Sequence, residues 1–124
     1  MNVISKYFVK QIKSFGPAFK GILWMLKDHN IFVHFPAACA VVGLAWYFEV
    51  SQSEWLWLLW AISVVWITET VNTAIERLVD LVSPDYHELA GKVKDLAAAA
   101  VLLATFFAIT VGGIVFFPYL KNLF

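Results

Sequence analysis

Charge is scarce in this chain of 124 residues. Only 15% of the residues are charged, and nine acidic side chains balance nine basic ones. Soluble domains carry about 25% charged residues, and domains that bind nucleic acid usually show a basic excess. The single cysteine, Cys39, can form no disulfide within the chain and provides no cysteine set for zinc. These absences exclude a disulfide-stabilised scaffold, a cysteine-based zinc site and a basic nucleic-acid-binding surface.

The glycine-rich motifs that usually hold nucleotides are missing too. The chain contains no G-x-G-x-x-G. Gly16 and Gly21 have the spacing of a P-loop, but Ile22 and Leu23 follow them, where that motif requires Lys and then Ser or Thr. The three histidines are scattered and form no Ser-His-Asp pattern. Any nucleotide must therefore be held by groups outside these motifs.

Apolar residues are abundant, at 61% against ~45–50% in ordinary globular chains. They gather in three stretches long enough to span a membrane, at residues 31–48, 55–75 and 96–120. Since a backbone in lipid must satisfy its own hydrogen bonds, these stretches predict an all-α integral membrane fold with three transmembrane helices. A short turn is expected at 49–54 and a longer, charged loop at 77–95. We expect residues 1–124 to form a single domain.

Residues 1–27 have the pattern of an amphipathic helix rather than of a secretory signal, since lysines interrupt every apolar run. Ile4, Phe8, Ile12 and Phe15 share one face, and lysines occupy the opposite face. The pattern predicts a helix lying in the membrane surface, with a solvated helix packed on the charged loop as the alternative. We expect Gly16-Pro17 to break this helix before a second short piece at 18–27.

The basic residues are distributed unevenly. Five lysines precede the first stretch, Arg77, Lys92 and Lys94 lie in the second loop, and the first loop has none. The positive-inside rule therefore predicts a cytoplasmic N-terminus and an external C-terminus.

The second apolar stretch carries a polar face at its cytoplasmic end. At 100° per residue, five polar side chains fall within an arc of about 100°: Glu69, Asn72, Thr73, Glu76 and Asp80. An ionisable group inside a membrane is costly and points to function. The alternative for Glu69 alone is a carboxylate that joins helices through a Lys or Asn partner.

The carboxylates come from the cytoplasmic ends of all three stretches, because Asp28 precedes the first and Asp95 opens the third. Crowded carboxylates need a cation, and oxygen ligands without cysteine favour Mg²⁺ over Zn²⁺. Mg²⁺ held by one or two carboxylates commonly carries a nucleotide phosphate. Lys92 and Lys94 could meet the phosphate oxygens.

The run Glu69-Thr-Val-Asn72-Thr-Ala-Ile-Glu76-Arg-Leu-Val-Asp80 resembles the signature of the prokaryotic diacylglycerol kinase family, which includes undecaprenol kinases. Tyr86-His-Glu88-Leu, Lys94-Asp95 and Phe19-Lys-Gly21 resemble the family as well. The resemblance covers about residues 15–117. It implies a surface helix, three transmembrane helices and a homotrimer with sites at subunit boundaries.

The resemblance also implies a reaction, the transfer of the γ-phosphoryl group of Mg-ATP to a lipid hydroxyl. By motif, Glu69 would be the general base and Asn72 would support the reacting groups. Glu76 and Asp28 would bind Mg²⁺, although the family usually has Glu at the latter position. Nucleotide-binding residues would be Lys94, Asp95, Asp80, Glu88 and Glu76.

Two kinds of alternative remain open. Within the family, the Tyr86–Leu89 run favours diacylglycerol as the acceptor, giving phosphatidic acid, with undecaprenol as the alternative. Outside it, a lone membrane glutamate would fit a small ion- or proton-coupled transporter, and a structural or regulatory membrane subunit would need no chemistry. Stacking of carboxylates toward one end argues against a relay across the membrane.

Overall fold

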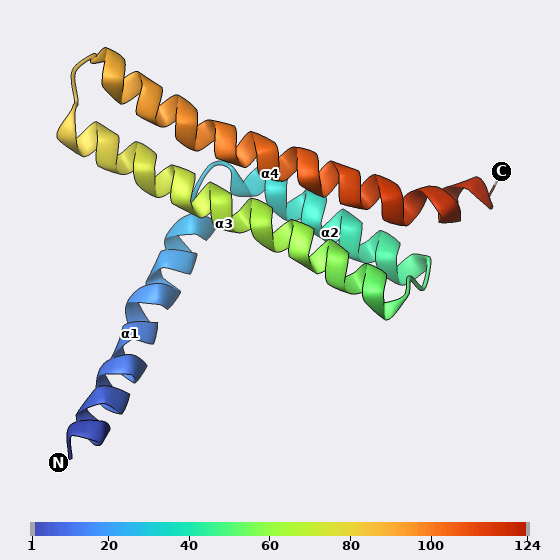
Figure 1. Cartoon of the computed structure of the whole chain (residues 1–124), viewed down its shortest axis with the longest axis horizontal. Coiled ribbons are helices and arrows are strands. Elements are labelled where there is room, and N and C mark those ends of the chain that lie inside the picture. The colour runs from blue at the N-terminus through green and yellow to red at the C-terminus, as the bar shows by residue number, and fades with distance from the viewer. Residues whose placement is uncertain (1, 124) are drawn as a thin grey trace. The chain divides into compact units, whose positions relative to one another are not determined.

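The computed structural model describes residues 2–123, and these residues form four helices and no strand (Figure 1). The helices are α1 (Val3–Leu26), α2 (Ile31–Tyr47), α3 (Gln52–Val82) and α4 (Glu88–Lys121). The prediction of an all-α fold is confirmed. The chain divides into two compact units, one reaching to Phe35 and one beginning at Pro36.

In the first unit, α1 runs without interruption past Gly16-Pro17, so the predicted break there is wrong. Proline removes one backbone hydrogen bond and commonly costs about 3 kcal/mol inside a helix. Here α1 has 24 residues, and the other backbone hydrogen bonds of so long a helix offset the one that Pro17 removes. Residues that favour helix, such as Ala18 and Lys20, follow the proline. No residue of α1 is buried.

The turn between α2 and α3 is shorter than expected, because α3 begins at Gln52, inside the predicted turn. Glu49, with a φ of 50°, reverses the chain after α2. Ser51 then caps α3: its hydroxyl accepts from the Glu54 amide, and the Glu54 carboxylate accepts from the Ser51 amide at 2.7 Å. This reciprocal capping box fixes where α3 starts.

The predicted loop at 77–95 is mostly helical, and this expectation is wrong. α3 continues to Val82 and α4 begins at Glu88, which leaves a connection of five residues, Ser83–His87. The ring of His87 caps α4 by accepting from the Leu89 amide at 3.2 Å. Helix propagation adds one hydrogen bond per residue, so charge alone does not end a helix.

In the second unit, α3 and α4 lie side by side and antiparallel (Figure 1). The core gathers where the C-terminal part of α2, the first half of α3 and the second half of α4 meet. Its buried residues are Ala45, Val50, Leu58, Ala61, Val111, Val115 and Phe116. At the same end, the Tyr119 hydroxyl donates to the Glu54 carboxylate at 2.7 Å, and the ring of Phe48 packs on the rings of Phe116 and Tyr119.

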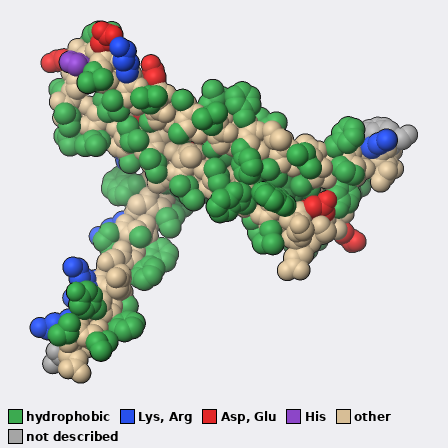
Figure 2. Space-filling model, viewed as in Figure 1, with side chains coloured by type: hydrophobic (Ala, Val, Ile, Leu, Met, Phe, Trp, Pro, Cys, Tyr) green, Lys and Arg blue, Asp and Glu red, His purple; other side chains and the backbone are tan. Residues whose placement is uncertain are grey.

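Large apolar side chains remain exposed on all four helices (Figure 2). α3 and α4 are each long and apolar enough to cross a membrane. α2 has 17 residues, about 26 Å, and a third crossing is reached when α1 and α2 count together as one broken span. The exposed apolar surface suits lipid as the solvent.

Candidate active site

The polar face of α3 continues its buried stripe. Leu58, Ala61 and Val65 are buried on one line of the helix, and Asn72 follows on that line at 6% exposure. At 100° per residue, Glu69 and Glu76 lie within about 60° of it. Both glutamates are half-buried, whereas Val71 and Leu78 on the other side are exposed. The stripe that packs the bundle at one end thus becomes polar at the other.

Asn72 and Glu76 are joined one helical turn apart. The Asn72 Nδ2 donates to Glu76 Oε1 at 3.0 Å, while the Asn72 Oδ1 is buried without a hydrogen-bond partner. A buried amide oxygen left unpaired costs about 1–3 kcal/mol. Such an atom calls for an explanation in function, since folding alone would select an apolar side chain here.

Farther along α3, Asp80 reaches the neighbouring helix. The Lys94 Nζ donates to Asp80 Oδ1 at 2.5 Å, with both side chains partly in solvent. The pair borders an open pocket of ≈ 240 Å³ at the α3–α4 connection. The pocket is lined by Val79, Asp80, Ser83, Pro84, Asp85, Tyr86, His87, Ala90, Gly91 and Lys94. Figure 2 shows charged side chains of both signs gathered at this connection.

Three other predicted site residues are Glu88, Asp95 and Asp28. Glu88 accepts from Lys92 at 2.7 Å on the exposed side of α4, and Asp95 is exposed on the same helix. Asp28 belongs to the first unit, where its Oδ1 accepts from the Asn30 amide at 3.4 Å just before α2. Among residues 2–123, no three His, Cys, Asp or Glu side chains are grouped as a metal site.

Ser83 and Gly91 are among the pocket residues that sequence reasoning missed. Gly91 lies in the first turns of α4, where glycine costs about 1 kcal/mol relative to alanine. A Cβ at Gly91 would meet no atom within 4 Å, so packing within the described residues does not require glycine there. Ser83 carried no signal in the sequence, because its place depends on where α3 ends.

The comparisons with known proteins show the family of this chain. The family described as prokaryotic diacylglycerol kinase matches residues 16–116. The chain belongs to that family. The undecaprenol kinase of Bacillus subtilis (strain 168) is 35% identical over 120 residues, which cover 96% of this chain and 94% of that protein.

Two diacylglycerol kinases are similar as well. The Escherichia coli (strain K12) protein is 33% identical over 104 residues, covering 82% of this chain and 84% of its own length. The Synechocystis (strain PCC 6803) protein is 38% identical over 112 residues, covering 89% of this chain and 64% of its own length. The resemblance drawn from the α3 motif is confirmed, and the chain is a lipid kinase of the membrane. Membership in this family sets aside the transporter and the inert subunit.

Proposed function

We propose that this kinase transfers the γ-phosphoryl group of Mg-ATP to the primary hydroxyl of a membrane lipid at the polar end of α3. The observation that carries the proposal is the Asn72–Glu76 pair, in which the buried Asn72 lies on the stripe that also bears Glu69. α3 has 31 residues, about 46 Å, and so exceeds the ~30 Å hydrocarbon layer. Its polar end can therefore meet a lipid headgroup and a water-borne nucleotide together.

In this proposal Glu69 accepts the proton of the lipid hydroxyl. It is the earliest carboxylate of the polar face along α3, and hence the one nearest the apolar stretch. A positioned base is one contribution to phosphoryl transfer, which otherwise depends on alignment and charge neutralisation. Asn72 supports the site by holding the carboxylate of Glu76.

Glu76 and Asp28 are the proposed protein ligands of Mg²⁺. Glu76 has the donor chemistry for the ion, because the bond from Asn72 fixes Glu76 Oε1 and the second carboxylate oxygen is not part of that bond. Mg²⁺ prefers carboxylate oxygens and usually completes its shell with water and substrate phosphates. When bound, the ion would neutralise phosphate charge. Activity is expected to vanish with chelator, and Glu76→Gln should raise the Mg²⁺ requirement; an unchanged requirement would remove Glu76 from the metal shell.

The nucleotide is proposed to bind at the α3–α4 connection. Lys94 would meet the phosphates, Asp80 would hold Lys94 at the pocket, and Glu88 and Asp95 would serve the nucleotide from α4. The paired Lys94 supports this, because a lysine held beside an open pocket is placed for an anionic ligand. The protein is proposed to act in the bacterial inner membrane as a homotrimer with its N-terminus in the cytoplasm. A cytoplasmic-only reporter fused after Phe124 should stay inactive.

We propose diacylglycerol as the acceptor, giving phosphatidic acid. Undecaprenol is the second candidate, favoured by the relative that matches 96% of the chain. Both lipids present a primary hydroxyl, so one assay decides. Purified protein in mixed micelles would receive Mg-ATP with each lipid in turn, and the phosphorylated lipid would be measured. Faster phosphorylation of undecaprenol would reverse the choice, and no lipid-dependent ATP use with either would overturn the proposed reaction.

A further inference from the structure

Because α1 is continuous, the apolar residues before and after Gly16-Pro17 lie on one face of a single helix. The apolar stripe of α1 consists of Ile4, Phe8, Ile12, Phe15, Phe19, Ile22 and Leu26. At 100° per residue these seven side chains fall within an arc of about 80°. Each is between 41 and 69% exposed. A break at Gly16-Pro17 would have let the stripe of each half turn independently.

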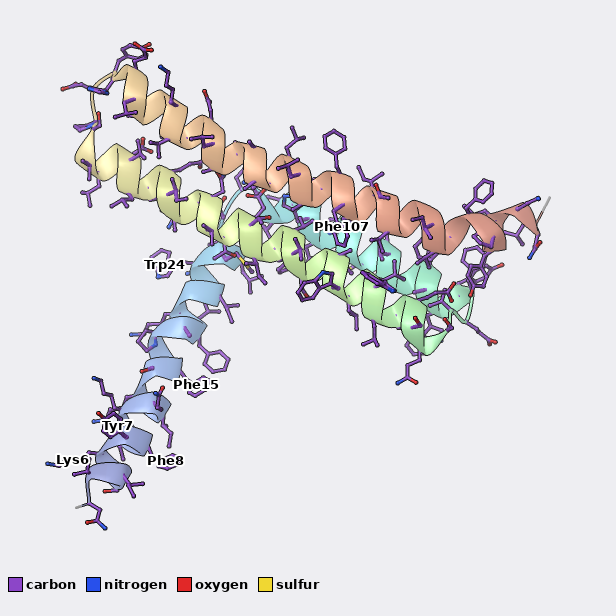
Figure 3. The ribbon with its side chains drawn as sticks, viewed as in Figure 1. Lys6, Tyr7, Phe8, Phe15, Trp24 and Phe107 are labelled. Carbon is purple, nitrogen blue, oxygen red and sulfur yellow. The ribbon has the colours of Figure 1, made fainter. Side chains whose placement is uncertain are left out.

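The opposite side of α1 carries four lysines, together with Trp24. The lysine stripe consists of Lys6, Lys10, Lys13 and Lys20, which fall within another arc of about 80° centred some 160° from the apolar stripe. Residues 1–27 contain no Asp or Glu. Figure 3 shows Phe8 and Phe15 on one side of α1 and Lys6 on the other. Near the end of the helix, the Lys27 ammonium lies 5.7 Å from the ring centre of Trp24.

This pattern discriminates among the surfaces that could cover α1. Burial across the hydrocarbon layer would carry the lysines into lipid, where each is strongly disfavoured. A second copy of α1 could cover the apolar stripe, but it would bring another set of lysines and no acid, so the lysines would be left without an opposite charge. A bilayer surface accepts the apolar stripe, while anionic headgroups meet the lysines at its edge.

We propose that α1 docks selectively on anionic phospholipid, as a charge sensor of its leaflet. Lysines near an anionic surface each favour binding about fivefold, so two of them contribute about 25-fold. A further consequence rests on the proposed function: the kinase turns a neutral alcohol into an anionic phosphate monoester. Its product would therefore strengthen the docking of α1 and hold the enzyme where product has formed.

The experiment is hydrogen–deuterium exchange on the full-length protein in vesicles, followed in the α1 segment. Phosphatidylcholine vesicles are compared with the same lipid mixed with phosphatidylglycerol, and with the same lipid mixed with phosphatidic acid. We expect α1 amides to exchange more slowly in both anionic mixtures. High salt should remove the difference, because the Debye length falls to about 3 Å at 1 M. Inorganic phosphate added to neutral vesicles should have no effect.

A control variant outside α1 makes the test local. Lys6→Gln combined with Lys13→Gln should reduce the response to anionic lipid about 25-fold, and glutamine preserves helix propensity in a helix with no buried residue. Lys121→Gln, which removes a charge from the last turn of α4, should leave the response intact. Equal protection of α1 in neutral and anionic vesicles would overturn the proposal. Exchange requires no turnover, so an inactive protein that still shows this selectivity would count against the proposed reaction alone.

Discussion

The two ends of the α3–α4 pair use polar groups in opposite ways. At the Ser51 end, the Glu54 carboxylate accepts from Tyr119 and from the Ser51 amide, beside a core of packed apolar side chains. At the other end, the Asn72 Oδ1 is buried without a partner, and several carboxylates share one face of α3. Polar groups that are paired by hydrogen bonds stabilise the bundle. An unpaired buried polar group lowers stability, and this is typical of residues that serve ligand binding. Whether the polar groups are paired therefore distinguishes the end that carries the candidate site better than the presence of charged residues does.

The largest expected effect is at Glu69. Glu69→Gln keeps the shape of the side chain but cannot accept a proton, so turnover should fall by about 10²–10⁴-fold. Mg-ATP affinity should stay nearly unchanged. Turnover and nucleotide affinity measured in the same lipid micelles check this. Turnover within tenfold of the parent would reject the base, and loss of assembly would favour a structural role.

At the end of α3 that carries Glu69, Asn72→Leu is expected to change the Mg²⁺ requirement without lowering thermal stability. Leucine has a similar size, cannot hold the Glu76 carboxylate and leaves no amide oxygen buried. A residue that orients a metal ligand typically contributes 10–100-fold to metal affinity, so the Mg²⁺ requirement should rise by about that factor. Thermal stability should not fall. Lower stability with an unchanged Mg²⁺ requirement would contradict the contrast between the two ends.

A smaller effect is expected at Asp80. Its pair with Lys94 is solvent-exposed, and such pairs contribute little, so Asp80→Asn should change ATP affinity by about fivefold or less. Because we place Asp80 as a group that acts through Lys94, it should have no further effect in the Lys94→Gln background. ATP binding to the single and double variants measures this. A tenfold loss in the Lys94→Gln background would make Asp80 a direct nucleotide contact.

At the Ser51 end, the smallest effect on the reaction is expected. Tyr119→Phe removes only the hydroxyl that donates to Glu54. Tm should fall by a few degrees, since a hydrogen bond to a carboxylate is lost, while turnover below that temperature stays at the parent level. Phe116→Tyr, which adds a hydroxyl in the same core, serves as a matched control for altered packing. Reduced turnover at full stability in Tyr119→Phe would show that this end is coupled to the reaction.

Local rules were enough for much of the fold. Apolar runs long enough to span a membrane predicted α2, α3 and α4, since lipid leaves a backbone few alternatives to helix. Periodicity placed Glu69, Asn72 and Glu76 on one face, and their order formed a recognisable signature. Boundaries were predicted less well. The helix through Pro17 and the short connection at Ser83–His87 depend on the balance of hydrogen bonds over whole helices.

The helical class, the amphipathic character of residues 1–27 and the family motif on α3 follow from residue order alone. Which polar groups meet depends on how the helices pack. Asp80 and Lys94 are 14 residues apart, and their pairing required α3 and α4 to turn at Ser83–His87 and pack antiparallel. The burial of Asn72 likewise depended on α3 directing that face inward. A periodic pattern fixes the face of a helix, whereas its neighbour is set by packing between segments that are distant in sequence.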